Sequence, residues 1–175
     1  MTGKILGGVI LICALIAGIA MYYLQVYAFY EEVTPNGMTD VQLMTKSGEL
    51  ETILYEDFQA IDADSSPIRY RACFTTQTPL STFLSTYEPY SGASPRNAPG
   101  WFECFDSDAI GEDILSGRAQ VFVSQRNMEF GIDRVVAITG DGRGYIWHEV
   151  NECGDKAYDG SPLGDDCPER EIGGN

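Results

Sequence analysis

Histidine and basic side chains are scarce in this chain. Among its 175 residues there is one histidine, and 11 lysines and arginines stand against 26 aspartates and glutamates. The shortage of positive charge disfavours nucleic-acid binding, because phosphate contacts need a basic patch. No C-x-x-C pair, haem-attachment motif, G-x-S-x-G or S-x-x-K in a supporting context occurs. We therefore predict no catalytic residue, no cofactor and no metal site, and a protein that is not an enzyme.

The single histidine, His148, belongs to an alternating segment in which it shares one strand face with Ile146 and Val150. A catalytic histidine needs a nucleophile or an orienting partner, and no triad motif accompanies this one. We interpret it as a structural, hydrogen-bonded residue. The acidic stretch 62–67 lacks the spacing of a twelve-residue calcium loop, and we interpret it as a solvated turn.

One long apolar run stands at the start of the chain. Residues 5–24 carry no charge, and a helix of that length spans the roughly 30 Å hydrocarbon core of a bilayer. We predict a transmembrane anchor helix over 5–30. Lys4 precedes the run and Glu31 follows it, so the positive-inside rule places residues 1–4 in the cytoplasm. The rest would then be exported, across the inner (cytoplasmic) membrane of a bacterium. We expect an aromatic belt at the far interface, formed by Tyr22, Tyr23, Tyr27 and Tyr30.

Two features of the apolar run leave alternatives open. Gly18-Ile19-Ala20 loosely resembles a signal-peptide cleavage site, although the run continues past it into aromatic residues. Small residues would let a second helix approach closely inside lipid, but they are also common in any membrane span. The candidate helix-packing residues are Gly7, Gly8, Ala14 and Gly18.

Four cysteines follow the apolar run: Cys73, Cys104, Cys153 and Cys167. An even number in an exported domain is typical of two disulfides, for which three connectivities exist. We prefer Cys73–Cys104 and Cys153–Cys167, because each bond joins neighbours in the chain. Disulfides also support export independently of the flanking charges.

The remaining chain has the length and the patterning of one α+β domain. We expect a juxtamembrane linker over 31–39, a periplasmic domain over 40–167 and a flexible C-terminal tail over 168–175. Alternating residues predict a mainly antiparallel sheet, whose clearest part is a hairpin of 132–139 and 144–150 around Gly140 to Arg143. About two short helices are expected, one starting at Thr78-Pro79 and one over 108–115 capped by Ser107. Further strands are expected at 40–45, 68–74 and 118–124, while 49–60 fits either a helix or a strand.

The exported part is strongly acidic. All 26 acidic residues and 10 of the 11 basic ones follow residue 30, which gives residues 31–175 a formal net charge of −16. Such a charge suits solubility, a basic periplasmic protein partner or weak binding of divalent cations. The long polar loop 90–100 and the tyrosine-rich junction 22–30 are the expected places for contacts, since long loops are often functional or mobile.

Several stretches of the sequence resemble uncharacterised single-span membrane proteins of Rhodobacter- and Roseobacter-type alphaproteobacteria. The resemblance covers most of the chain and rests on residues 3–8, 21–32, 60–69, 98–104, 131–137 and 141–144. It implies no activity, because the family is a domain of unknown function. Some members carry a histidine-kinase label, which this sequence does not support because it lacks the glycine boxes that bind ATP.

Our leading hypothesis is a non-catalytic anchored protein that acts by protein–protein contacts, as an accessory or assembly subunit of an envelope or respiratory membrane complex. An alternative is a periplasmic sensor domain that binds a ligand or a cation in a pocket near residues 90–100. A weaker alternative is a thiol oxidoreductase, which requires an exposed cysteine with a lowered pKa.

Overall fold

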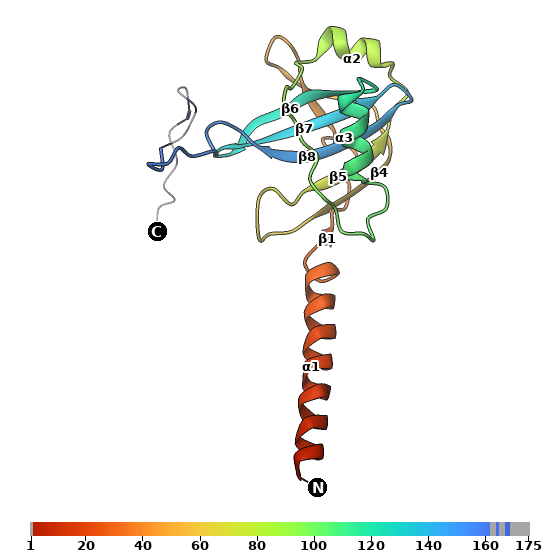
Figure 1. Ribbon diagram of the computed structural model, residues 1–175. Helices are drawn as coiled ribbons and strands as arrows, with labels where there is room; N and C mark the ends of the chain where they lie inside the picture. The colour runs from red at the N-terminus through yellow and green to blue at the C-terminus, as the bar shows by residue number, and fades with distance from the viewer. Residues whose placement is uncertain (1, 162–163, 165–166, 169–175) are drawn as a thin grey trace.

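A computed structural model of the chain describes residues 2–161, 164, 167 and 168 (Figure 1). A long N-terminal helix projects away from a domain built on an antiparallel sheet, which confirms the predicted α+β class. In chain order the elements are α1 (Thr2–Val26), β1 (Glu31–Glu32), β2 (Gln42–Met44), β3 (Leu50–Thr52), β4 (Glu56–Asp62), β5 (Arg71–Thr75), α2 (Leu80–Thr86), α3 (Ser107–Leu115), β6 (Ala119–Glu129), β7 (Ile132–Thr139) and β8 (Arg143–Val150).

The main sheet has six strands in the order β1-β4-β5-β8-β7-β6, and every neighbouring pair is antiparallel. Its central strands are buried on both faces, which explains the short apolar runs 135–138 in β7 and 145–147 in β8 that interrupt the alternation. A second sheet consists of β2 and β3 alone. Residues 88–90 cover the outer edge of β6, because Tyr90 N–H donates to the Val121 carbonyl at 2.8 Å and Val123 N–H to the Glu88 carbonyl at 2.9 Å. That edge is therefore closed to further strands over this stretch.

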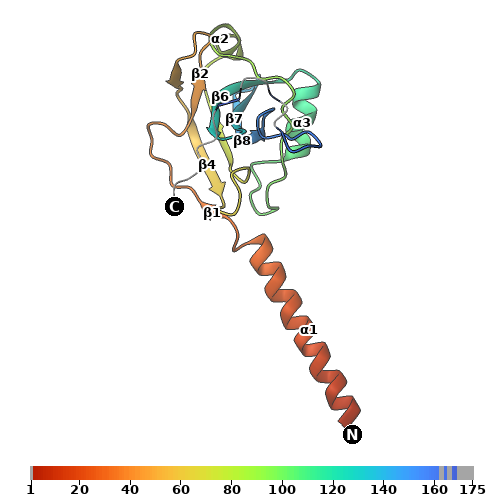
Figure 2. The same cartoon turned by 90° about the vertical axis from the view of Figure 1, so that its left-hand side faces the viewer.

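Each face of the main sheet has its own hydrophobic core, so the domain has three layers (Figure 2). On one face Phe74, Phe122 and Ile146 pack against residues of β2 and α2, such as Leu43 and Phe83. The core on the other face lies under α3 and the segment 90–105, and consists of Ile61, Cys73, Phe102, Phe105, Ile110, Val121, Val135, Ala137, Tyr145 and Trp147. Successive residues of a strand point to opposite faces, so each central strand contributes to both cores.

Gly144 in β8 is required by the ring opposite it. It pairs with Phe74 across β5 and β8, and a Cβ at this position would lie 2.1 Å from Cζ of Phe74. The aromatic ring therefore occupies the space that any other residue would need.

Several element boundaries differ from those expected. Helix α1 ends at Val26 rather than at 30. Glu31 and Glu32, expected in a linker, form β1 and pair with Asp62 and Ile61 of β4. The ambiguous stretch 49–60 is β-structure, divided between β3 and β4. Of the tail expected over 168–175, residues 169–175 lie outside the described residues.

Both helix starts in the domain also differ. Helix α3 begins at Ser107 itself, and Asp106 is its N-cap, with a carboxylate that accepts from the N–H groups of Asp108 and Ala109. A carboxylate is as good a cap as a hydroxyl, and it also favours the positive end of the helix. Before α2, Pro79 has an extended ψ of 142° and therefore occupies the N-cap rather than the first turn.

Candidate functional site

The end of α1 and the residues that follow it are fastened to the domain by four side-chain contacts. The indole Nε1–H of Trp101 donates to the Val26 carbonyl at 2.6 Å, and so satisfies one of the free carbonyls at the helix C-terminus. The ring of Tyr30 meets that of Trp101 edge-on, with centroids 6.5 Å apart. The guanidinium of Arg69 lies 5.8 Å from the ring centroid of Phe29 and 5.9 Å from that of Tyr30. We call these five residues the anchor joint.

The predicted aromatic belt divides at this joint. Tyr23 stacks on Tyr27 with centroids 5.9 Å apart, and Tyr22 meets Tyr27 edge-on at 6.3 Å. All three are exposed, Tyr22 and Tyr23 on α1 and Tyr27 in the turn that follows it. Tyr30 instead packs against the core under the 90–105 segment and belongs to the domain.

The small residues Gly7, Ala14 and Gly18 lie near one side of α1, since the helix repeats about every 3.6 residues, whereas Gly8 lies about 100° around the helix from that side. A Cβ added at any of the three glycines would meet no other atom within 4 Å. Helix α1 is long and apolar enough over Gly3–Val26 to cross a membrane, and a signal sequence would pass the same test.

The loop 90–100 is held against the sheet by two buried charged residues. Arg71 is 3% exposed, and its guanidinium donates to the carbonyls of Arg96 at 2.9 Å and Asn97 at 3.3 Å. From β8, one carboxylate oxygen of Glu149 accepts from Ser94 N–H at 2.6 Å. Polar groups buried in this way are costly unless they are paired, so both side chains fix the loop in one conformation.

The structure joins Cys73 to Cys104 and Cys153 to Cys167, the pairing that chain order favoured. The first bond ties β5 to the segment that covers one face of the sheet. The second closes the stretch that follows β8. Two disulfides are typical of a domain exported to an oxidising compartment.

His148 lies on the face of the main sheet opposite to the one that the 90–105 segment covers. It is 3% exposed, and its ring stacks on Tyr70 with centroids 5.1 Å apart. Nε2 accepts from Arg134 Nε–H at 2.9 Å, so the ring proton is on Nδ1, which donates to the Pro67 carbonyl. Burial lowers the pKa of His148 to about 4, and the charges of Arg134 and Arg71 act in the same direction. These contacts describe a neutral packing residue.

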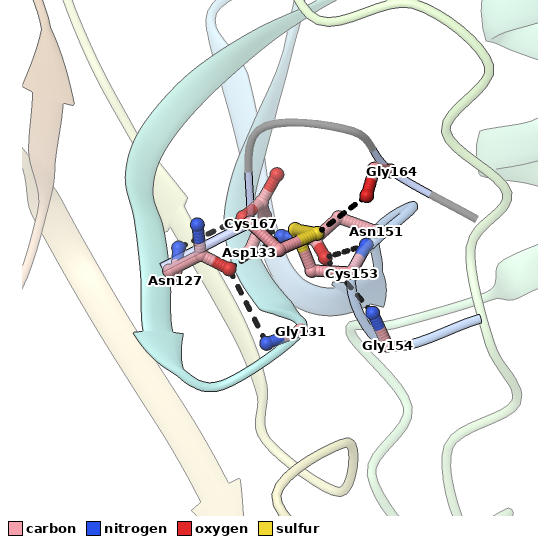
Figure 3. Close-up of a disulfide and its surroundings, with 8 residues drawn as sticks. All are labelled: Asn127, Gly131, Asp133, Asn151, Cys153, Gly154, Gly164 and Cys167. Atoms are coloured by element: carbon pink, nitrogen blue, oxygen red, sulfur yellow. Dashed lines mark hydrogen bonds between the residues drawn. A yellow bond between two sulfur atoms is a disulfide. The ribbon is translucent and has the colours of Figure 1, made fainter. Parts of the chain in front are cut away.

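A polar cavity of about 730 Å³ lies between the ends of β6 and β8. It adjoins the second disulfide, whose surroundings are shown in Figure 3. Its wall includes Tyr90, Arg126, Asp133, Asn151 and Glu152, together with Pro89, Ser91, Gly92, Asn127, Val150, Cys153, Asp155 and Gly164. The cavity therefore adjoins the start of the 90–100 loop, where a sensor domain was expected to have a pocket. We call it the Asp133 cavity.

Asp133 is the buried charge of this cavity. It is 1% exposed, and its Oδ1 accepts from Asn127 N–H at 2.9 Å and from Asn151 Nδ2 at 2.7 Å. Asn127 has a φ of 44°, and its side-chain oxygen accepts from the N–H of Gly131 at 3.2 Å. The end of the β6–β7 hairpin is thus organised around one carboxylate oxygen of Asp133, and the other oxygen takes no part in it.

A family model covers the domain but not the helix. It describes a family of unknown function, DUF6446, and matches residues 41–168. The chain belongs to this family. No curated protein and no solved structure matches the chain significantly. The matched residues include β2 to β8, both disulfides and the Asp133 cavity, whereas β1 precedes them.

Sequence reasoning missed the side chains that define the anchor joint and the Asp133 cavity. Sequence analysis gave Trp101 no role of its own, and it assigned Asp133 only to a strand. A signal for Asp133 was present, because strand alternation places it on the same face as the buried residues Val135 and Ala137. Arg71 carried a similar signal, because strand alternation places it on the same face as the buried Cys73.

Proposed function

We propose that the protein is a non-catalytic, single-span inner-membrane protein with a cytoplasmic N-terminus and a periplasmic domain. It acts through protein contacts, as an accessory or assembly subunit of an envelope or respiratory membrane complex. The observation that carries this proposal is the anchor joint. A tether that only localised a domain would need no contact between the helix end and the domain.

The short connection supports the same reading. Helix α1 ends at Val26 and the sheet begins at Glu31, so too little chain lies between them for a flexible spacer. The Trp101–Val26 hydrogen bond and the Arg69 contacts then restrict the orientation of the domain above the helix. A partner that binds the helix in the membrane would therefore meet the domain in a defined orientation.

The helix offers a face for such a partner. Gly7, Ala14 and Gly18 would let a second helix approach closely within lipid. At about 100° per residue, Ala20 lies roughly 140° around the helix from the centre of that face, which makes Ala20→Leu a control for Ala14→Leu. The two changes add the same volume and the same hydrophobicity.

The test is purification of the tagged, chromosomally expressed protein in a mild detergent, followed by mass spectrometry. We expect one membrane complex at stoichiometric yield, lost in Ala14→Leu and retained in Ala20→Leu. Recovery of the unmodified protein alone would contradict the subunit proposal, and equal effects of both substitutions would contradict the assigned helix face.

The acidic domain gives the partner a preferred chemistry. A net charge of −16 over residues 31–175 favours a basic periplasmic surface, and such an association weakens as salt screens the charges. Binding that is unaffected by salt would argue against this contact. The second candidate function, a periplasmic ligand sensor, is favoured by the Asp133 cavity and predicts a ligand-dependent rise in melting temperature.

A further inference from the structure

The Asp133 cavity contains a carboxylate oxygen with an unused hydrogen-bonding capacity. Oδ2 of Asp133 is buried and accepts no hydrogen bond from any residue that the structure describes. The nearest cation is the Nη1 of Arg126 at 3.5 Å, which is an ion pair without a hydrogen bond. Buried polar atoms are rarely left in this state, because an unmade hydrogen bond to a charged group is costly.

The position of this oxygen is fixed in advance. The two hydrogen bonds to Oδ1 come from Asn127 and Asn151, and Asn151 Nδ2 also donates to Asn127 Oδ1 at 2.8 Å (Figure 3). Asn151 N–H in turn donates to the Gly131 carbonyl at 3.0 Å. The carboxylate cannot rotate Oδ2 away from the cavity without breaking this network. The acceptor is therefore already ordered, but Oδ2 has almost no accessible surface, so a ligand must first displace a neighbouring side chain such as the half-exposed Arg126.

The local charge balance favours a cation. Arg126 is shared, since its Nη2 forms a hydrogen bond of 2.6 Å with Glu88 while its Nη1 lies 3.5 Å from Asp133. Glu152 and Asp155 add two exposed carboxylates to the described wall. Burial and then the charges of Asp133 and Glu149 raise the pKa of Tyr90 to about 12, which is consistent with a negative potential.

We propose that the Asp133 cavity binds the primary ammonium group of a small organic cation, with Asp133 Oδ2 as the buried acceptor. An ammonium carries three N–H donors, of which one would meet Oδ2, while the exposed carboxylates of Glu152 and Asp155 on the wall add attraction at longer range. Tyr90 also lines the cavity. Among the residues that the structure describes, no group of three or more histidine, cysteine or acidic side chains is placed to hold a metal ion. The volume is in the range of small-molecule sites.

The proposal does not depend on the subunit role, because it concerns residues of the domain alone. An ammonium group could come from a free diamine or from a lysine side chain of another protein. Both sources present the same primary ammonium group, and two probes distinguish them. Putrescine represents the free diamine, and N-acetyl-lysine-N-methylamide represents the side chain.

The experiment measures binding to the full chain in a nonionic detergent by isothermal titration calorimetry at low salt. Tetramethylammonium is the control for charge without N–H donors, and 1,4-butanediol is the control for shape without charge. Asp133→Asn keeps the acceptor for Asn127 and Asn151 but places an amide in the cavity. Asp64→Asn removes an exposed carboxylate from the loop after β4 and is the matched charge control.

We expect saturable binding of at least one ammonium probe, weakened about tenfold or more by Asp133→Asn and unchanged by Asp64→Asn. Tighter binding of putrescine would identify a free amine as the source, and tighter binding of the lysine derivative would identify a protein side chain. If Asp133→Asn fails to fold, Glu152→Gln replaces it, because Glu152 is exposed and its substitution should not disturb folding. We expect Glu152→Gln to weaken binding severalfold.

Three results would overturn the proposal. The first is no saturable binding of either ammonium probe, which would leave the buried oxygen to water. The second is equal binding of tetramethylammonium, which would indicate only general attraction to an acidic surface. The third is equal loss of affinity in Asp64→Asn and in the cavity variants.

Discussion

Protonation of His148 is the perturbation for which the structure gives the most definite magnitude. The ring is buried between Tyr70 and the sheet, Nδ1–H donates to the Pro67 carbonyl, and Nε2 accepts from Arg134. A second proton would have to be added at Nε2. It would replace the acceptor of the Arg134 N–H with a donor, and it would place a positive charge beside a guanidinium in a desolvated site.

The expected cost follows from the pKa. Burial, followed by the charges of Arg134 and Arg71, lowers it from 6.5 to about 4, while the hydrogen bond to Pro67 opposes the shift. Because the unfolded state binds this proton more readily, folding stability is greatest above the unfolded pKa and is lost as the pH falls from 6.5 towards 4. The loss is about 2 kcal/mol at about pH 5, and about 3 kcal/mol once both states are protonated.

The assay is straightforward because the chain has a single histidine. With a tag that lacks histidine, the ring resonances in an NMR titration belong to His148 alone. We expect a midpoint near pH 4, and nitrogen shifts of the Nδ1–H tautomer. The free energy of unfolding should fall by about 2 kcal/mol between about pH 7.5 and about pH 5, and the fall should be absent in His148→Gln. A midpoint near the ordinary histidine value, or a proton on Nε2, would refute the reasoning.

Three further predictions concern the core, the disulfides and the joint. Gly144→Ala should lower the free energy of unfolding by about 1–3 kcal/mol through overlap with Phe74, whereas Gly140→Ala, whose Cβ meets nothing within 4 Å, should leave the melting temperature unchanged. The two disulfides close loops with sequence separations of 31 and 14 residues, so loop closure predicts a cost of about 4 kcal/mol for losing Cys73–Cys104 and about 3 kcal/mol for losing Cys153–Cys167. The paired serine variant of Cys73 and Cys104 should therefore have the lower melting temperature of the two. Trp101→Phe removes one donor at a cost of about 1 kcal/mol, and it should broaden the spin-label distance distribution between the free Cys13 and a cysteine at Ser85. An unchanged distribution would mean that the joint does not orient the domain.

The sequence predicted the parts of the fold that local patterns determine. Alternation and the glycines at 140 and 142 located the β7–β8 hairpin, and the apolar run located α1. Local patterns could not show that Glu31 and Glu32 form a strand, because these residues pair with β4 some thirty residues later. They also could not show that β3 and β4 are strands, since stretch 49–60 has no clear period.

The candidate site was less accessible to sequence reasoning than the fold. The 90–100 loop was identified as a place for contacts, but its anchors Arg71 and Glu149 belong to β5 and β8. A charged residue in a strand has the same pattern whether its face is solvated or covered by a loop. Which case holds depends on what packs over the sheet, and that is a long-range property.

The position of the loop connects the two proposed roles. Residues 90–92 line the Asp133 cavity, residues 94–97 are held by Glu149 and Arg71, and Trp101 binds the end of α1. One short segment of chain therefore runs from the cavity to the anchor joint and is fixed to the sheet between them. Continuity alone is not coupling, because coupling needs an element with two arrangements that both sites influence. The buried contacts of Arg71 and Glu149 favour a single arrangement. The segment is therefore a rigid connection between the cavity and the anchor joint. A ligand in the cavity would affect a partner that binds at the cavity mouth, and it would not move the helix.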